Sequence, residues 1–197
     1  AIIVARRFGD RLFLDVLFVS LIDGKQVPFL SMLDDASSLH FARLMTNQAG
    51  EMDQSSRVVI QLLETFWISI FGPPDEVVVD AGSNLTSDEL GQFLAGHGCQ
   101  LRPVPGEAHW QLGKAESHGG ALKLTFYKTA LDFPPYTPQD AQRTMLHSYN
   151  AKNELLNRGG VSPNQFAFGR NPRLPGALLN EPDQRHQPMA IQAPGTS

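Results

Sequence analysis

The N-terminal part of the chain alternates long apolar runs with short polar turns, a pattern typical of antiparallel strands. Residues 11–22 (RLFLDVLFVSLI) are apolar at nearly every position and predict a central strand covered on both faces. The Asp-Gly pair that follows is a hairpin signal, so residues 27–33 predict an antiparallel partner. Asp34 and Asp35 are assigned to a turn, and residues 39–45 predict a third strand.

The middle of the chain alternates between helical and strand patterns. Apolar residues recur at helical spacing over residues 53–71, and a Gly-Pro-Pro sequence ends this helix. The β-branched segment 76–79 leads into Asp80 and predicts a strand, which the helical crossover before it would place parallel to a member of the first sheet. Residues 86–98 open with a capping box and close at a glycine, and residues 101–104 predict a fifth strand.

Three helices complete the predicted domain. The first is interrupted early by Gly119 and Gly120, the second is capped by a Thr-Pro-Gln-Asp sequence, and the third opens with Ser-Pro; they span residues 114–131, 137–153 and 162–169. The order of elements predicts an α/β fold with a five-stranded mixed sheet, in which three antiparallel strands and two parallel ones are flanked by helices.

Composition limits the class of protein. Residues 1–180 are long enough for one domain, whereas residues 181–197 are rich in Pro and Gln without periodicity and predict a disordered tail or linker. No apolar stretch approaches the length of a membrane span, and the single cysteine, Cys99, is expected to be a small buried hydrophobe. The chain starts in the character of a strand without Met, so we expect a fragment or processed piece of a longer protein.

Three acids stand at unusual places in this pattern. Asp15 lies inside an apolar run, Asp80 ends the fourth strand, and Glu116 falls in the first turn of a helix, with thirty-five residues between it and Asp80. An ionised carboxylate is costly to bury unless a cation or strong donors compensate it. In open α/β sheets, sites form at the carboxyl ends of parallel strands where the winding direction switches. One metal site built from the three acids explains them together.

Carboxylate oxygens favour hard divalent cations, so the expected cofactor is Mg²⁺ or Mn²⁺, two ions per site. Asp15 suits a role as the ligand shared by both ions because it comes from the rigid centre of the sheet, and Asp80 and Glu116 would each complete one ion. Each acid also has an ordinary interpretation, since an acid at a strand end often caps a turn and one in a first helical turn complements the helix dipole. The net charge of −4 argues against strong sequence-independent DNA binding by this piece alone.

The motifs around these acids resemble those of a known family. Asp15 in the first strand, VVVDAGSNLTS around Asp80, GKAESHGGALK around Glu116 and the later segment SPNQFAFGRNPRLP are similar to the catalytic core of retroviral and long-terminal-repeat retrotransposon integrases, members of the RNase H-like superfamily. The thirty-five-residue interval is that family's well-known spacing. The resemblance covers roughly residues 8–178.

The resemblance implies an enzyme that cleaves DNA and transfers its strands with two metal ions, using Asp15, Asp80 and Glu116 as metal ligands and catalytic residues. Its partners would be the DNA of element ends and of the target, and a further copy of itself in a homodimer or higher oligomer. It would act inside the cell, on chromosomal DNA in the nucleus if the host is eukaryotic. Lys114 and Lys123 would contact DNA, unless they form an ordinary solvated helix face.

Other residues near the acids have two interpretations. His109 and Trp110, in the loop before Glu116, either touch DNA or serve surface and packing roles, and His118 lies near the site or is an ordinary helix residue. Leu85 replaces an aromatic residue of many relatives, and Leu112 stands where they often have Asn or Asp.

The rival hypotheses are an RNase H-like nuclease, a DNA transposase, and a decayed or domesticated copy that retains DNA or protein binding. The family's upstream zinc-binding domain and downstream basic domain are absent from the sequence, so we expect that this piece alone is unable to complete end processing and strand transfer.

Overall fold

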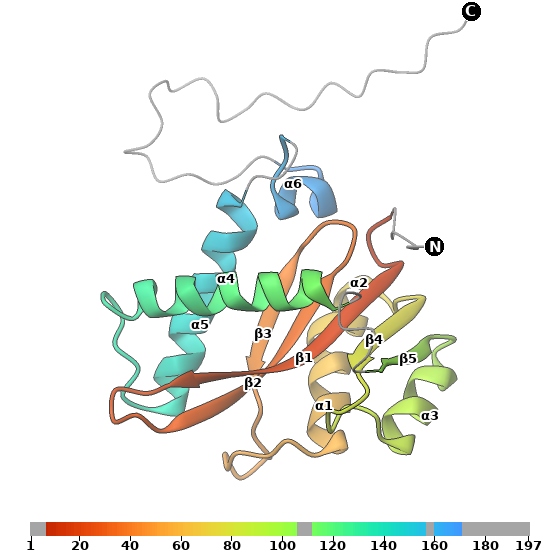
Figure 1. Ribbon diagram of the computed structural model, residues 1–197, viewed down its shortest axis with the longest axis horizontal. Coiled ribbons are helices and arrows are strands. Elements are labelled where there is room, and N and C mark those ends of the chain that lie inside the picture. Colours follow the sequence, from red (N-terminus) through yellow and green to blue (C-terminus); the bar gives the residue numbers. More distant parts are fainter. Residues whose placement is uncertain (1–6, 106–111, 157–159, 171–197) are drawn as a thin grey trace, which may run out of the picture.

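The computed structural model describes residues 7–105, 112–156 and 160–170 (Figure 1). Five strands form a single sheet: β1 (Arg11–Ser20), β2 (Gln26–Asp34), β3 (His40–Leu44), β4 (Glu76–Asp80) and β5 (Gln100–Val104). The helices are α1 (Ser56–Leu63), η1 (Glu64–Ile68), α2 (Ser69–Phe71), α3 (Asp88–Gly96), α4 (Gly113–Thr129), α5 (Pro138–Leu155) and α6 (Pro163–Phe168). Each predicted strand and helix is therefore present; the proposed tail, residues 181–197, lies outside the described residues.

The sheet has the predicted mixed topology, with the strand order β3-β2-β1-β4-β5. The pairs β1–β2 and β2–β3 are antiparallel, whereas β4 and β5 add in parallel beside β1. The parallel ladder between β1 and β4 runs from Arg11 opposite Glu76 to Phe13 opposite Val78. The strands β2 and β3 lie on one side of β1, and β4 and β5 lie on the other, so the winding direction switches at β1. A site is therefore expected at the carboxyl ends of β1 and β4.

Helices cover both faces of the sheet, and each face has its own apolar core. On one face, alternate residues of β1 and β2 such as Leu12, Leu14 and Leu30 pack with α1, α3 and Trp67. The opposite face, crossed by α4 and α5 (Figure 1), contributes the other set of residues to a core of Leu17, Val19, Val27, Phe29, Ala42, Leu122, Phe126, Ala141, Met145 and Tyr149. Alternation along the strands therefore assigns the buried side chains to one or the other face of the sheet.

The central strand departs from the prediction that it is covered on both faces throughout. Its burial alternates after residue 14, and both Asp15 and Phe18 are exposed. A backbone hydrogen bond closes the hairpin between β1 and β2, because the Leu21 amide donates to the carbonyl of Lys25 at 2.9 Å. Apolar composition overstated the burial of β1, because α4 crosses the strand rather than covering its length.

Local geometry differs from the sequence predictions in the helix of residues 56–71 and at the start of α3. The first helix contains a π-helical turn, η1, which places Trp67 fully inside the aromatic cluster with Phe8, Phe41 and Phe71. Ser87, rather than Thr86, caps α3, because its side chain accepts from the Leu90 amide. The predicted cap at the start of α5 is present as a capping box, and α6 ends at Gly169 in the left-handed conformation. The short helix α6 packs Phe168 against Phe8 and Phe71 of the same aromatic cluster.

The predicted interruption of α4 at Gly119 and Gly120 is wrong, since the helix is continuous from Gly113 to Thr129. A Cβ at Gly119 would lie 3.2 Å from Cδ2 of Leu17, so the missing side chain lets α4 approach β1 closely. Gly120 has open space around it and no comparable packing reason. Gly119 thus sets the depth at which α4 sits on the sheet, and neither glycine breaks the helix.

The open edge of β3 is closed by α5. The Asn153 side chain accepts from the His40 amide at 3.0 Å and donates to the His40 carbonyl at 2.8 Å, while Gln142 accepts from the Leu44 amide at 2.7 Å. These bonds satisfy backbone groups that would otherwise invite another strand. None of the helices in the described ranges is long and apolar enough to cross a membrane.

Candidate functional site

The strand register brings the first two acids level with each other. The ladder between β1 and β4 ends at Phe13 and Val78, and two residues further along each strand lie Asp15 and Asp80. Because side chains alternate, both acids are on the same face as Phe13 and Val78, which is the face crossed by α4. Asp15 is exposed and Asp80 half-buried, so both are open to a ligand at the end of the sheet.

The helix α4 carries the third acid across this face. Glu116 is exposed in the first turn of α4, and Gly119, one turn later, touches Leu17 of β1. Leu17 is two residues from Asp15 and on the same face of the strand. The close contact at Gly119 therefore holds the part of α4 that bears Glu116 beside the part of β1 that bears Asp15.

The charges of the three acids influence one another. The protein around Asp15 displaces part of its hydration and raises the pKa of its carboxyl, and the negative charges of Asp80 and Glu116 raise this pKa further. The Val16 amide, which donates to Asp15 Oδ1 at 2.8 Å, and the Lys123 ammonium oppose the rise. Asp15, Asp80 and Glu116 thus form one electrostatic cluster with Lys123 at its side.

The turn after β4 folds around Asp80. Its Oδ1 accepts from the Gly82 amide at 3.0 Å, and its carbonyl accepts from the Ser83 amide at 3.0 Å and from the Ser83 hydroxyl at 2.6 Å. A Cβ at Gly82 would lie 3.6 Å from Asp80 Oδ1, in ordinary van der Waals contact. These bonds orient the carboxylate at the end of β4, which is the turn role that the ordinary interpretation assigned to it.

The three acids are not in ligand positions. In residues 7–105, 112–156 and 160–170 no group of three or more His, Cys, Asp or Glu side chains is arranged closely enough to hold a metal ion. The donors themselves suit Mg²⁺ or Mn²⁺, since they are carboxylates, and the charges of Asp80 and Glu116 act on the carboxyl of Asp15. The structure thus brings the acids into one cluster with the right chemistry, and it does not preform the expected metal pair.

Solved structures with similar folds include integrase catalytic cores and an intasome. For the HTLV-2 integrase catalytic core domain in complex with magnesium, in its dimeric form, the TM-score is 0.63 at 17% identity over 82% of this chain and 97% of that chain. The trimeric form gives a TM-score of 0.62 at 18% identity, covering 81% and 96%. The simian T-cell lymphotropic virus intasome in complex with the PP2A regulatory subunit B56 gamma gives 0.71 at 19% identity, covering 92% of this chain and 62% of that chain.

The fold is that of an integrase catalytic core. This is the RNase H-like architecture that the resemblance implied. No protein-family model matches the sequence, and no curated protein matches it. At 17–19% identity the similarity establishes the fold, and the chemistry has to be argued from the residues on it.

The two lysines expected to contact DNA occupy different surroundings in this integrase fold. Lys123 is half-buried, and its charge acts on the carboxyl of Asp15. Lys114 instead donates to the carbonyl and the carboxylate of Asp35, its Nζ lying 3.2 Å from Oδ1. His109 and Trp110 lie outside the described residues, so their expected contacts stay predictions.

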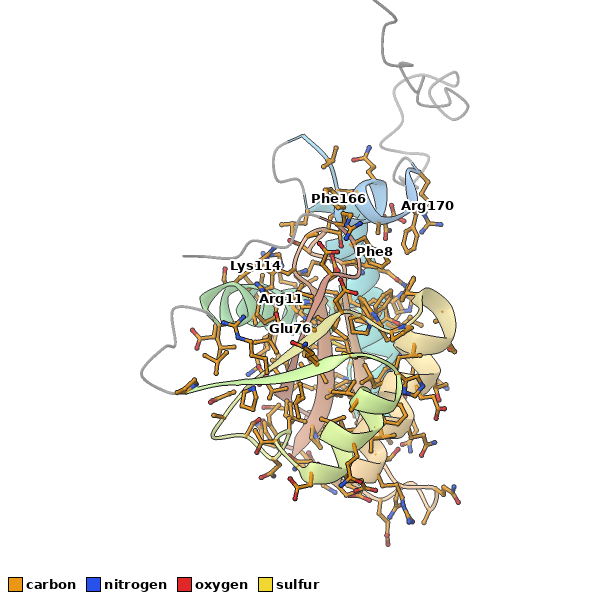
Figure 2. The ribbon with its side chains drawn as sticks, turned by 90° about the vertical axis from the view of Figure 1, so that its right-hand side faces the viewer. Phe8, Arg11, Glu76, Lys114, Phe166 and Arg170 are labelled. Atoms are coloured by element: carbon orange, nitrogen blue, oxygen red, sulfur yellow. The ribbon has the colours of Figure 1, made fainter. Side chains whose placement is uncertain are left out.

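An ion-pair network beside Lys114 was not predicted. Asp34 is a turn residue as expected, accepting from the Ser37 amide and hydroxyl at 2.7 Å. Asp35 does more than turn chemistry, because it also binds Arg11, which in turn binds Glu76 (Figure 2). The signal in the sequence was weak, consisting of charged residues at the ends of otherwise apolar strands.

A buried polar cluster beneath α4 was also missed. His118 is buried rather than open to the site. It lies near His40, whose Nε2 is 2.7 Å from the Ser31 hydroxyl oxygen. Burial lowers the pKa of His40 well below its usual range, and the positive charge of Lys152 makes a smaller contribution in the same direction. The ring of His40 is therefore neutral at pH 7. The backbone of His40 is bonded to the side chain of Asn153, so β3 is joined to α5 at this place. The buried Cys99 was predicted correctly, and burial raises its pKa to about 11.

Proposed function

We propose that this chain is the catalytic core of a retroelement integrase, a metal-dependent polynucleotidyl transferase and endonuclease that cleaves DNA and joins its strands. The observation that carries the proposal is the meeting of Asp15 and Asp80 at the end of a parallel strand pair, in the same electrostatic cluster as Glu116. The integrase-core fold supports this function, since the similar HTLV-2 domain was solved in complex with magnesium.

Asp15, Asp80 and Glu116 would hold the divalent cations. When bound, such ions supply Lewis-acid stabilisation of the attacking and leaving oxygens of a phosphodiester. The residues of the chain hold the frame: Asp15 is fixed by the central strand, Asp80 by the turn at Gly82, and Glu116 by α4. Lys123 offsets negative charge beside Asp15, and in the proposed complex its ammonium faces a DNA phosphate.

The raised pKa of Asp15 supports a role in cation binding. Carboxylates that destabilise one another gain more from a shared cation than isolated ones do, because the cation removes their mutual repulsion. Glu116, exposed on the helix, is the member of the set that can turn towards the two acids on the strands without moving the sheet.

The proposed partners are DNA and further copies of the chain. The similar HTLV-2 core was solved in a dimeric and a trimeric form, which supports self-association of this fold. The proposed place of action is inside the cell, on chromosomal DNA in the nucleus if the host is eukaryotic. Sedimentation of the purified chain tests the association, and a monomer at micromolar concentration would contradict it.

One observation favours a second function. Because the acids of the described residues are not arranged as metal ligands, the chain also fits a domesticated copy that keeps the fold for binding DNA or protein. The two functions differ in one measurable respect, since only the enzyme needs the charge of Asp80 for turnover.

The deciding experiment measures joining of DNA strands, and its reversal on branched oligonucleotides, with Mg²⁺ or Mn²⁺. We expect activity from the natural chain. In Asp80→Asn the activity should fall by at least about 100-fold, because loss of a metal ligand should cost at least as much as loss of a residue that only orients a ligand. Asp88→Asn is the matched control, because Asp88 is an exposed acid in the first turn of α3. Equal activity of the natural chain and Asp80→Asn would remove Asp80 from the mechanism.

A further inference from the structure

A row of side chains with alternating charges runs along the sheet face that α4 crosses. Arg11 of β1 donates through Nε to Glu76 Oε2 of β4 at 2.6 Å and through Nη1 to Asp35 Oδ2 at 3.3 Å. At one end Arg102 of β5 reaches Glu76 at 3.3 Å, and at the other Lys114 of α4 binds Asp35. Figure 2 shows Arg11, Glu76 and Lys114 gathered on this side of the sheet. Lys114 is the one member that belongs to a helix.

The side chains in the middle of this charged row are shielded from solvent. The side chains of Arg11 and Asp35 are 14% and 10% exposed, whereas that of Lys114 is 32% exposed. Ion pairs in such surroundings are screened less by salt than surface pairs, and leaving one partner alone is costly. The contact of Lys114 with Asp35 is therefore a fixed attachment, in contrast to an exposed lysine that samples many positions.

A second contact joins the same turn of α4 to the sheet. Leu112 and Ala115, on either side of Lys114, pack against an apolar cluster made by Phe13, Leu33, Val78 and Val104. Asp15 and Asp80 follow Phe13 and Val78 by two residues on their strands. The attachment of α4 thus lies immediately beside the place where the two acids emerge.

We propose that Lys114 is a positioning residue for Glu116. Held by the carbonyl and carboxylate of Asp35, its ammonium fixes the first turn of α4 and so determines where Glu116, two residues later, stands relative to Asp15 and Asp80. The ammonium has two acceptors on Asp35, the backbone carbonyl oxygen and Oδ1. This inference rests on the proposed function for the role of Glu116, and it replaces the expected DNA contact of Lys114.

The first test measures amide hydrogen exchange across α4 in Lys114→Met and Lys114→Arg. We expect exchange in the first turn of α4 to rise at least about 10-fold in Lys114→Met and to stay near the natural rate in Lys114→Arg, because arginine keeps the charge and the donors. Lys128→Met is the matched control, an exposed lysine in the last turn of the same helix. Unchanged exchange in Lys114→Met would overturn the proposal whether or not the chain is an enzyme.

The second test uses the sign of a change in Mn²⁺ affinity, measured by calorimetry without DNA. Removing a positive charge near three acids should strengthen cation binding if electrostatics alone acted. A positioning role predicts the reverse, a weakening of about 10-fold in Lys114→Met that Lys114→Arg restores. Tighter binding in Lys114→Met would contradict the proposal. If the natural chain binds no Mn²⁺, the proposed metal site fails, and the exchange measurement still decides whether Lys114 fixes the helix.

Discussion

Two groups of acids share one face of the sheet and behave in opposite ways. At the paired end, Asp35 and Glu76 lie against Arg11, Arg102 and Lys114. At the acid end, burial and, to a smaller extent, the charges of Asp80 and Glu116 raise the pKa of Asp15. Only a few residues along β1 and β4 separate these ends.

The difference shows how one scaffold can separate stability from function. Acids paired with arginine and lysine attach β1, β2, β4 and α4 to one another, so they define the frame. Acids crowded together destabilise the fold when ionised and gain from an added cation, which is the property of a binding site. The contrast leads to predictions in which substitutions at the two ends change the free energy of unfolding in opposite directions.

The largest effect is expected at the paired end. Arg11→Met removes the cation shared by Asp35 and Glu76, and we expect a loss of about 2–3 kcal/mol in the free energy of unfolding, measured with urea. The value lies below the full cost of breaking a buried pair because each acid keeps a second cation. Arg143→Met is the control, since its pair with Asp140 is exposed and 3.6 Å long, and its loss should stay below about 0.5 kcal/mol. Equal losses in the two variants would remove the distinction.

The next effect lies between the two ends, where α4 rests on β1. Gly119→Val forces a side chain into the 3.2 Å space beside Leu17, and we expect a loss of about 1–3 kcal/mol in the free energy of unfolding. Gly120→Val is the matched control, because no atom lies within 4 Å of its Cβ position and valine favours the helix over glycine. Thermal unfolding followed by circular dichroism distinguishes them, and a neutral Gly119→Val would show that α4 does not depend on this close contact.

The smallest effect is expected at the acid end, and it has the opposite sign. Because the folded state raises the pKa of Asp15 above 3.8, ionisation of this carboxyl costs stability, and the cost grows as pH rises through the folded pKa. Without metal, Asp15→Asn should therefore be more stable than the natural chain at pH 7 by roughly 0.5 kcal/mol, with no difference near pH 3.

Adding Mg²⁺ should sharpen the same contrast. If the proposed site binds the ion in the folded state alone, Mg²⁺ should raise the melting temperature of the natural chain and leave that of Asp15→Asn unchanged. Scans at pH 3 and 7, with and without Mg²⁺, test both parts. A less stable Asp15→Asn at pH 7 would show that Asp15 belongs to the frame rather than to a site.

Local signals allowed much of the fold to be predicted. Apolar runs and turn residues located all five strands to within two residues, because alternation and turn geometry depend on neighbours in the sequence. The meeting of Asp15 and Asp80 was also predictable, since parallel strands joined by a helix end at the same edge of a sheet. Their roles as metal ligands, with Glu116, stay a prediction.

Only the tertiary structure decided the features that join distant segments. The sequence by itself determined the order of elements, the mixed sheet and the acids at its edge, because these follow from periodicity and spacing. It did not determine that Gly119 packs rather than breaks α4, since the reason is the side chain of Leu17 from another element. Nor did it show that Lys114 binds Asp35, seventy-nine residues earlier, because ion pairs depend on distances in space that no local pattern encodes.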